Sequence, residues 1–358
     1  MAIDMRSGRL GRRRFLRQAG AAAGGFAALA GGLAARGVAA QSGGTPRSGG
    51  TVTLYNGQHE STTQAMVAAF IKETGIKVEI RSGEDPEIAA QLLAEGDGSP
   101  ADVVFTENSP PLMLLSGKGM IAPLDAATLA AVPAVHNSPK GEWVGVAART
   151  NVLLYAPALL PESALPLSLL DLAKPEWKGK IAIAPAEGDF LPVVSTVLKI
   201  NGEDAAKSWA GGLARNAKVY QGNEAILKAV EGGEVVAGAV NHYYWFRMAA
   251  EIGADKMTSR LHYFRGGDPG AVVNVSGAAV LASSKQPELA QRLVAFLVGA
   301  SGQRALVESR DFEYPLGAGA QASPELKPFA ELEPPTIGFA DLGDGVAAVQ
   351  LLQDAGLL

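Results

Sequence analysis

The chain has 358 residues, of which 47% are hydrophobic and 19% are charged, and its formal net charge is −5. This composition is typical of a folded globular protein, and the absence of a basic excess argues against a nucleic-acid partner. The sequence contains no cysteine, which excludes disulfides, zinc–thiolate sites, iron–sulfur sites and cysteine nucleophiles.

The N-terminus has the pattern of an export signal. The adjacent Arg12 and Arg13 lie in a basic run typical of the twin-arginine route, and the stretch 18–35 is rich in Ala, Gly and Leu. That stretch is too weakly apolar for a spanning helix, which needs about 20 strongly apolar residues. Val38-Ala39-Ala40 is a small-residue cleavage site. We therefore predict that residues 1–40 are a signal peptide, and that the mature protein lies in the periplasm without a membrane span.

The next elements alternate between strand and helix. Residues 41–50 are a Gly/Ser/Thr-rich linker. Period-2 and period-3.6 patterns follow one another. They predict strands at 51–55, 76–80 and 102–105 and helices at 62–73 and 86–94. This order is typical of a mainly parallel sheet with crossover helices.

A second cycle of the same kind follows, so the mature length indicates two domains. It comprises predicted strands at 151–155, 181–185, 218–220, 235–240 and 277–281 and predicted helices at 191–199, 205–216, 224–231, 287–297 and 343–355. Together the two cycles predict the α/β fold class.

Chemically suggestive side chains follow three of these strands. His59 comes after the first strand, Glu107 after the third, and Tyr243 and Tyr244 after the strand at 235–240. Ligands of open α/β sheets bind beyond the carboxyl ends of strands. A highly charged cation can deprotonate a phenol, so one imidazole, one carboxylate and two phenolates would suit iron(III). Alternatively, the paired aromatic rings belong to the core or form a wall on which a ligand stacks.

Several ordered stretches carry a family resemblance that covers essentially all of the mature chain. They include Tyr55–His59, Glu73–Val78, Pro100–Val103, Pro175–Ile181, Asn241–Trp245, Asp268–Ala271 and Ser276–Leu281. With these stretches the chain resembles the periplasmic ferric-ion-binding proteins of ABC iron importers, which are class II periplasmic substrate-binding proteins. The resemblance implies two α/β lobes, each with a parallel or mixed sheet, joined by hinge strands. It also implies that His59, Glu107, Tyr243 and Tyr244 bind iron(III), and that an inner-membrane ABC permease receives the ion.

The resemblance also implies a site for an anion that binds together with the metal. Asn223 and Asn241 match amide positions of that site, Asn108 replaces a glutamine, and Gly188 belongs to the loop that would hold the anion.

The loop around Gly188 departs from the family pattern. Glu187-Gly188-Asp189 replaces a run of small residues, and two carboxylates there would repel phosphate. Carbonate, water or a carboxylate of the chain is therefore expected instead of phosphate, and Glu187 is an additional candidate ligand. Arg149 is another additional candidate, because it would either attract an anion and tune the field of the site or form a salt bridge at the hinge.

The resemblance sets the remaining expectations. The first lobe should comprise residues 51–150 plus about 276–325, and the second 151–275 plus about 326–358. The alternative function is a receptor for an organic solute, such as a thiamine-like cation, a polyamine or a sugar, stacked on the tyrosines. The sequence has no Gly-x-Ser-x-Gly, His-Glu-x-x-His or phosphate-loop motif, so we do not expect an enzyme. We expect a monomer.

Overall fold

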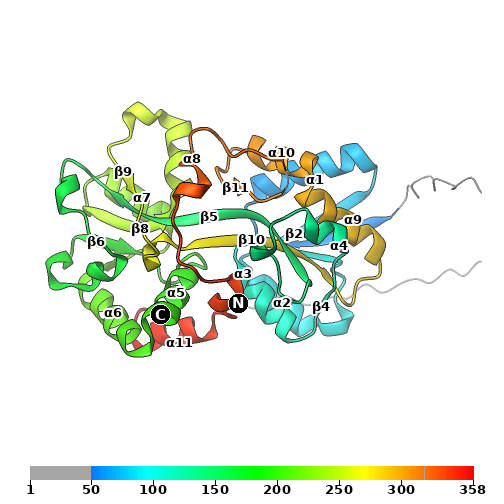
Figure 1. Ribbon diagram of the computed structural model, residues 1–358, viewed down its shortest axis with the longest axis horizontal. Helices are drawn as coiled ribbons and strands as arrows, with labels where there is room; N and C mark the ends of the chain where they lie inside the picture. Colours follow the sequence, from blue (N-terminus) through cyan, green and yellow to red (C-terminus); the bar gives the residue numbers. More distant parts are fainter. Residues whose placement is uncertain (1–49, 318) are drawn as a thin grey trace, which may run out of the picture. The chain divides into compact units, whose positions relative to one another are not determined.

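Eleven strands form the framework of the described part of the chain, in the order β2-β1-β3-β10-β5-β8-β6-β7, with β4, β9 and β11 attached at the side (Figure 1). The computed structural model describes residues 50–317 and 319–358. The predicted signal at 1–40 and residues 41–49 of the predicted linker lie outside the described residues. The strands are β1 (Thr51–Asn56), β2 (Lys77–Ser82), β3 (Val103–Thr106), β4 (Ile121–Ala122), β5 (Trp143–Tyr155), β6 (Ile181–Ile183), β7 (Lys218–Val219), β8 (Ala237–Asn241), β9 (Arg260–His262), β10 (Val273–Leu281) and β11 (Tyr314–Pro315).

Helices connect these strands and cover them. They are α1 (Glu60–Thr74), α2 (Asp85–Glu95), α3 (Ser109–Gly117), α4 (Ala126–Ala130), α5 (Phe190–Asn201), α6 (Glu203–Asn216), α7 (Asn223–Glu231), α8 (His242–Ile252), α9 (Pro287–Val298), α10 (Ala300–Glu308) and α11 (Val346–Asp354). None of the helices formed by the described residues is both long enough and apolar enough to cross a membrane.

Two long strands belong to both halves of this framework. β5 pairs with β10 from Trp143 to Thr150 and with β8 from Asn151 to Tyr155. We call the part built on β1, β2, β3, β4 and β11 the first lobe, and the part built on β6, β7, β8 and β9 the second lobe. β1 runs parallel to β2 and β3, and β6 runs parallel to β7 and β8, whereas β5 and β10 are antiparallel to their neighbours. The predicted two-lobed α/β fold with mixed sheets is confirmed.

Local sequence explains where the elements begin and end. In α1 the buried side chains Thr62, Thr63, Met66, Val67 and Phe70 recur at helical spacing and therefore face the sheet. Gly75 ends the helix at φ 70°, a left-handed conformation that glycine adopts without steric cost.

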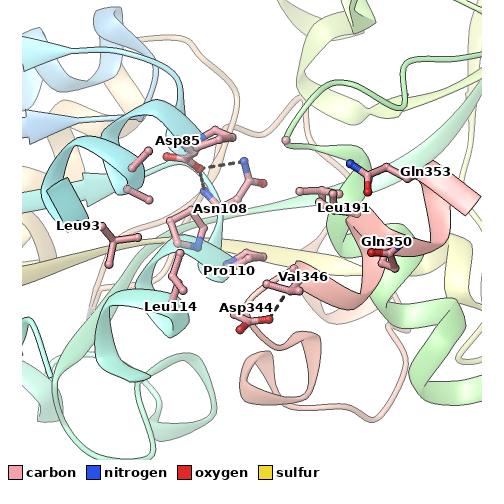
Figure 2. A pocket seen from close by; sticks show the side chains of 17 residues that line it. Asp85, Leu93, Asn108, Pro110, Leu114, Leu191, Asp344, Val346, Gln350 and Gln353 are labelled. Carbon is pink, nitrogen blue, oxygen red and sulfur yellow. Dashed lines mark hydrogen bonds between the residues drawn. The ribbon is translucent and has the colours of Figure 1, made fainter. Parts of the chain in front are cut away.

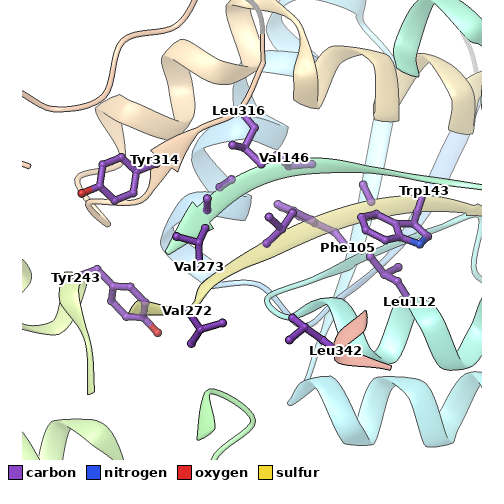
Figure 3. Packing of buried hydrophobic residues seen from close by; sticks show 14 of the residues in the cluster. Phe105, Leu112, Trp143, Val146, Tyr243, Val272, Val273, Tyr314, Leu316 and Leu342 are labelled. Carbon is purple, nitrogen blue, oxygen red and sulfur yellow. The ribbon is translucent and has the colours of Figure 1, made fainter. Parts of the chain in front are cut away.

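The core runs along the two long strands. Every residue of β5 and of β10 is buried. Figure 3 shows Trp143, Phe105 and Leu112 packed close to β10, with Tyr314 and Leu316 on the opposite side of β5. Because these strands are packed on both faces, they form a fixed support from which the surrounding loops and helix ends project.

The sequence-based expectation omitted α3, α4, α8, α10, β4, β9 and β11, and two of its differences from the structure bear on the site. The predicted strand 151–155 is only the second half of β5, which begins at Trp143. Tyr243 and Tyr244 do not lie in a loop after the strand but in the first turn of α8. The second difference alters the local chemistry, because the start of a helix carries a partial positive charge that stabilises anionic groups.

Candidate metal centre

The predicted site residues lie at the N-terminal ends of helices that follow strands of both lobes. His59 is the N-cap residue of α1, Asn108 that of α3, and Asn241 that of α8. Asp189 is the N-cap residue of α5, and Asn223 is the first residue of α7. None of these four N-cap side chains caps its own helix. Each helix start therefore presents N–H groups and a positive dipole end, a setting that stabilises negatively charged ligands.

Four predicted ligands from the two lobes converge at this place. Tyr243 Oη lies 2.8 Å from Glu107 Oε1 and 2.9 Å from Asp189 Oδ2. Tyr244 Oη lies 3.3 Å from the same Asp189 oxygen, and His59 Nε2 lies 3.4 Å from Glu107 Oε1. The two tyrosine rings are 4.4 Å apart between centroids, and the His59 ring meets Tyr243 edge-on at 4.8 Å. We call His59, Glu107, Tyr243 and Tyr244 the candidate metal centre.

Proton counting shows that this cluster holds more acceptors than donors. Tyr243 has one hydroxyl proton but faces two carboxylate oxygens, one on Glu107 and one on Asp189. Tyr244 supplies one further proton to Asp189. With both carboxyls ionised, one of the close oxygen pairs would therefore lack a proton, so the geometry requires an extra proton or a cation. A cation among these oxygens would satisfy all of them at once.

Burial and the neighbouring negative charges also shift the pKa values of the groups in this cluster. Burial, followed by the charges of Asp189 and Glu107, raises the pKa of Tyr243 well above its usual value. Burial raises the pKa of Glu107, although Arg149 opposes this shift, and burial together with Glu107 raises the pKa of Asp189 to about 6. Burial lowers the pKa of His59, so its imidazole is held in the neutral form that binds metals.

Unpartnered buried atoms mark the same region. His59 Nδ1, Asp189 Oδ1 and Glu187 Oε2 are buried and have no hydrogen-bond partner. Buried polar atoms normally have a hydrogen-bond partner, so a concentration of buried polar atoms without partners indicates a ligand-binding site. In this cluster the orphaned oxygens are acceptors, and they would be satisfied by a cation or a proton donor.

The predicted anion-binding residues are already engaged with the protein. Asn108 Nδ2 donates to Asp85 Oδ2 at 3.2 Å, and Asn108 Oδ1 accepts a hydrogen bond from Asn274. Asn223 Nδ2 donates to Asp189 Oδ2 at 3.0 Å. Gly188 faces Asn108, because a Cβ on Gly188 would lie 3.4 Å from Asn108 Nδ2. The donors available to a bound anion are thus largely occupied by Asp85 and Asp189.

Asn241 and Glu187 complete the predicted set. Asn241 is buried and pairs with Asn151 of β5 where β8 ends. Glu187 accepts a hydrogen bond from the backbone N–H of Asn223, and burial together with Asp189 raises its pKa to about 7. No hydrogen bond joins Glu187 to either tyrosine of the candidate metal centre in the described structure.

Asp189 is the functional candidate that sequence reasoning missed. The sequence assigned it only a repulsive effect on phosphate, whereas its Oδ2 accepts hydrogen bonds from Tyr243, Tyr244 and Asn223. A signal was present, because an aspartate directly before an apolar helical pattern is typical of an N-cap residue. That position would have placed Asp189 beyond the β6 strand end, beside the other candidates.

Arg149 lies beneath the centre, in β5. It is 0% exposed, its Nη2 pairs with Glu313, and the same nitrogen lies 3.7 Å from Glu107 Oε1. Burial alone would lower the pKa of Arg149, but Glu313 and Glu107 raise it above its usual value. The sequence predicted that Arg149 either attracts an anion or forms a salt bridge at the hinge. The pairing of its guanidinium with Glu313 favours the salt bridge.

A cavity of about 450 Å³ adjoins the centre (Figure 2). Its first-lobe wall includes Leu93 and Asn108, and its second-lobe wall includes Gly188, Leu191 and Val346. Asn108 directly follows Glu107 in sequence, and Gly188 directly precedes Asp189, so the polar end of the cavity lies next to the centre. A cavity lined by both lobes must change its volume when the lobes move relative to one another.

The centre differs from common metal sites in its ligand types. Across residues 50–317 and 319–358, no three His, Asp or Glu side chains form a group suited to a metal ion. Half of the candidate ligands are phenols, which such a grouping does not include. A phenolate is a hard oxygen donor that favours a small, highly charged cation.

Comparisons with known proteins agree with this architecture. A sequence family described as bacterial extracellular solute-binding protein matches residues 98–338. The chain is 44% identical over 307 residues to an Fe(3+)-binding periplasmic protein of Serratia marcescens, covering 86% of this chain and 90% of that protein. It is 40% identical over 308 residues to a major ferric iron-binding protein of Neisseria meningitidis, covering 86% and 93%. The solved structure of iron-bound HitA from Pseudomonas aeruginosa is 48% identical, with a TM-score of 0.83, covering 86% of this chain and 99% of HitA.

Proposed function

The chain belongs to the family of bacterial extracellular solute-binding proteins, and within that family we propose that it captures iron(III) and delivers the ion to an ABC permease. The alignments cover 90% of the Fe(3+)-binding periplasmic protein of Serratia marcescens and 93% of the major ferric iron-binding protein of Neisseria meningitidis. This coverage of nearly the whole of both relatives supports the proposal. We propose His59, Glu107, Tyr243 and Tyr244 as ligands.

The observation that carries the proposal is the position of Tyr243 Oη. It lies within 2.9 Å of carboxylate oxygens from both lobes, Glu107 and Asp189. An iron(III) ion at this junction would replace the shared protons and leave each oxygen coordinated. Two phenolates and the Glu107 carboxylate balance the three charges of the ion, and neutral His59 adds a nitrogen donor without further charge. Asp189 adds one negative charge beyond this balance, which the buried guanidinium of Arg149 partly offsets.

Asp189 is proposed to take the place of the separate anion that the family resemblance implies. Its Oδ2 already accepts from Asn223 and from both tyrosines. A carboxylate supplied by the chain needs no loss of translational freedom on binding. We therefore propose that phosphate contributes little, that Glu187 adds negative charge nearby, and that carbonate or water completes the coordination.

Lobe movement is proposed to govern capture and release. We propose lobes of residues 51–150 plus about 276–325 and 151–275 plus about 326–358, with β5 and β10 as hinge strands. Ligands come from both lobes, so opening of the hinge would separate His59 and Glu107 from the tyrosines. Export by the twin-arginine route, a monomeric state and the absence of catalysis are part of the same proposal.

The organic-solute alternative is not favoured. Tyr243 is 0% exposed, and its hydroxyl is held by two carboxylates. A ring in that position offers no free face on which a thiamine-like cation, a polyamine or a sugar could stack. The neighbouring cavity is lined by neither tyrosine of the pair.

Equilibrium dialysis tests the proposal. Purified protein stripped by a chelator is dialysed against iron(III) citrate, and bound iron is measured by elemental analysis. We expect one iron per chain that withstands washing. Parallel thermal-shift assays with thiamine, spermidine and glucose should show no stabilisation. No retained iron, or a shift with one of these solutes alone, would contradict the proposal.

A further inference from the structure

A buried carboxylate ties the hinge strand to the first-lobe side of the site. Glu313 lies directly before β11 and is 3% exposed. One of its oxygens pairs with Nη2 of Arg149 in β5, and its other oxygen, Oε2, accepts a hydrogen bond from Gln58 Nε2 at 3.0 Å. Because both oxygens are engaged, the position of Glu313 is fixed by β5 and by the turn between β1 and α1.

Gln58 continues this connection to a proposed ligand. Its Oε1 accepts a hydrogen bond from the backbone N–H of His59 at 2.7 Å. Gln58 is 3% exposed, so water does not compete well for either of its hydrogen bonds. The backbone of His59, at the very start of α1, is therefore held by a side chain that is itself held by Glu313.

Arg149 connects the same carboxylate to the second proposed ligand of the first lobe. Its Nη2 pairs with Glu313 and lies 3.7 Å from Glu107 Oε1. Its Nε and Nη1 are buried without partners. A buried guanidinium is strongly attracted to any carboxylate within reach. Glu313 therefore keeps Arg149 from forming a close pair with Glu107, which would compete with a bound cation.

We propose that Gln58, Glu313 and Arg149 form a positioning frame that orients His59 and leaves Glu107 available for iron(III). This inference rests on the proposed function and adds three residues that do not touch the ion. Groups that orient metal ligands typically change metal affinity by about 10–100-fold when they are removed. The frame also attaches these ligands to the hinge strand β5 at Arg149, two residues before β5 begins to pair with β8 of the second lobe.

The first test compares two equally buried glutamines. Gln58→Met removes the hydrogen bonds to Glu313 and His59 at nearly constant side-chain length. Gln303→Met is the matched control, because Gln303 is 0% exposed and its side chain bonds to Val146, Leu297 and Gly317. Iron(III) affinity is measured by chelator competition, together with the visible spectrum and the midpoint of thermal unfolding.

We expect both variants to melt at a lower temperature, while only Gln58→Met weakens iron(III) binding, by about 10–100-fold, and shifts the visible band. Equal affinities and spectra for the two variants would overturn the frame, because a merely structural role for Gln58 moves only the melting temperature.

The second test also serves if Gln58→Met does not fold. Glu313→Gln keeps the shape of the side chain but removes the charge that holds Arg149, so the guanidinium should move toward Glu107. We expect about 10–100-fold weaker iron(III) binding, and partial recovery in the double variant Arg149→Met/Glu313→Gln. A double variant as weak as, or weaker than, Glu313→Gln would contradict competition by Arg149.

The results distinguish a failure of the proposed iron(III) binding from a failure of the positioning frame. Wild-type protein that binds no iron(III) overturns the proposed function and the frame with it. Wild-type protein that binds one iron, alongside Gln58→Met and Glu313→Gln variants of unchanged affinity, overturns the frame alone.

Discussion

Replacing Asp189 by asparagine should stabilise the metal-free protein while weakening iron(III) binding. In the folded chain the pKa of Asp189 is raised from 3.8 to about 6, first by burial and then by Glu107. A shift of about 2 pKa units corresponds to at most about 3 kcal/mol against the ionised form. Asp189 is only half-buried as a residue, although its Oδ1 is buried, so solvent screening reduces this value and we expect about 1–2 kcal/mol.

The sign of the effect depends on pH. The folded-state pKa of Asp189 is higher than its unfolded value, so the folded protein binds more protons between about pH 4 and pH 6. Ionisation above that window lowers the stability of the wild type, and Asp189→Asn removes this loss. The gain in the free energy of unfolding should therefore be present at pH 8 and absent at pH 4.

Urea unfolding of the chelator-treated proteins at pH 4 and pH 8 measures the stability change, and chelator competition at pH 8 measures iron(III) affinity. We expect at least about 10–100-fold weaker binding. Asp102→Asn is the control: Asp102 accepts from Thr53 N, Ser284 Oγ and Gln286 N. That change should cost about 1–3 kcal/mol and leave affinity unchanged. An Asp189→Asn protein that is less stable than wild type at pH 8 would show that ionised Asp189 does not destabilise the metal-free fold. Wild-type affinity in this variant would show that Asp189 does not contribute to iron(III) binding.

Three further predictions concern the ligands, the lobes and the anion. Tyr243→Phe and Tyr244→Phe should each weaken iron(III) binding and shift or bleach the visible band, and each should lower the unfolding temperature of the metal-free protein, because Asp189 loses a hydrogen-bond donor. Wild-type colour and affinity in both variants would rule out the phenolate assignment. Solution scattering should give a smaller radius of gyration with iron(III) than without, since ligands come from both lobes, and equal radii would argue against hinge closure. Phosphate should raise iron(III) affinity only slightly in a chelator titration, bicarbonate being the comparison. A large gain specific to phosphate would mean that Glu187 and Asp189 do not repel the anion, and Glu187→Ala should make phosphate effective if Glu187 is the repelling group.

Strongly patterned elements could be predicted from the sequence, and the long central strand could not. The helix predicted at 62–73 is α1 at Glu60–Thr74, because its apolar spacing and terminal glycine agree. β5 was predicted only from residue 151, since Gly145, Arg149 and Thr150 interrupt its apolar pattern. These residues are buried because β5 is paired on both sides by distant segments, and that pairing is not visible in a local window.

The start of α8 was missed for a related reason. Tyr243, Tyr244, Trp245 and Phe246 have modest helix propensity, so the run does not suggest a helix. Asn241 was the available signal, because asparagine is a favoured N-cap residue.

In the candidate site, too, some features could be predicted from local sequence and others could not. Residue types and strand ends made His59, Glu107 and the two tyrosines candidates, because ligands collect beyond strand ends, and the family resemblance added their assignment as ligands, which stays a prediction. The contact between Asp189 and those tyrosines depends on the parallel pairing of β6 with β8, which brings the ends of two strands distant in sequence together within the second lobe. The frame around Glu313 depends on β11 pairing with β5, more than 150 residues away along the chain, so neither could be read from local sequence.

We propose above all that two phenolates, from Tyr243 and Tyr244, bind iron(III) at the junction of the lobes. The most direct test is a visible absorption titration of the metal-free protein with iron(III) citrate. We expect a phenolate-to-iron charge-transfer band that grows linearly and saturates at one iron per chain. Stoichiometric binding without such a band would place the ion elsewhere, and would contradict the assignment of Tyr243 and Tyr244 as ligands.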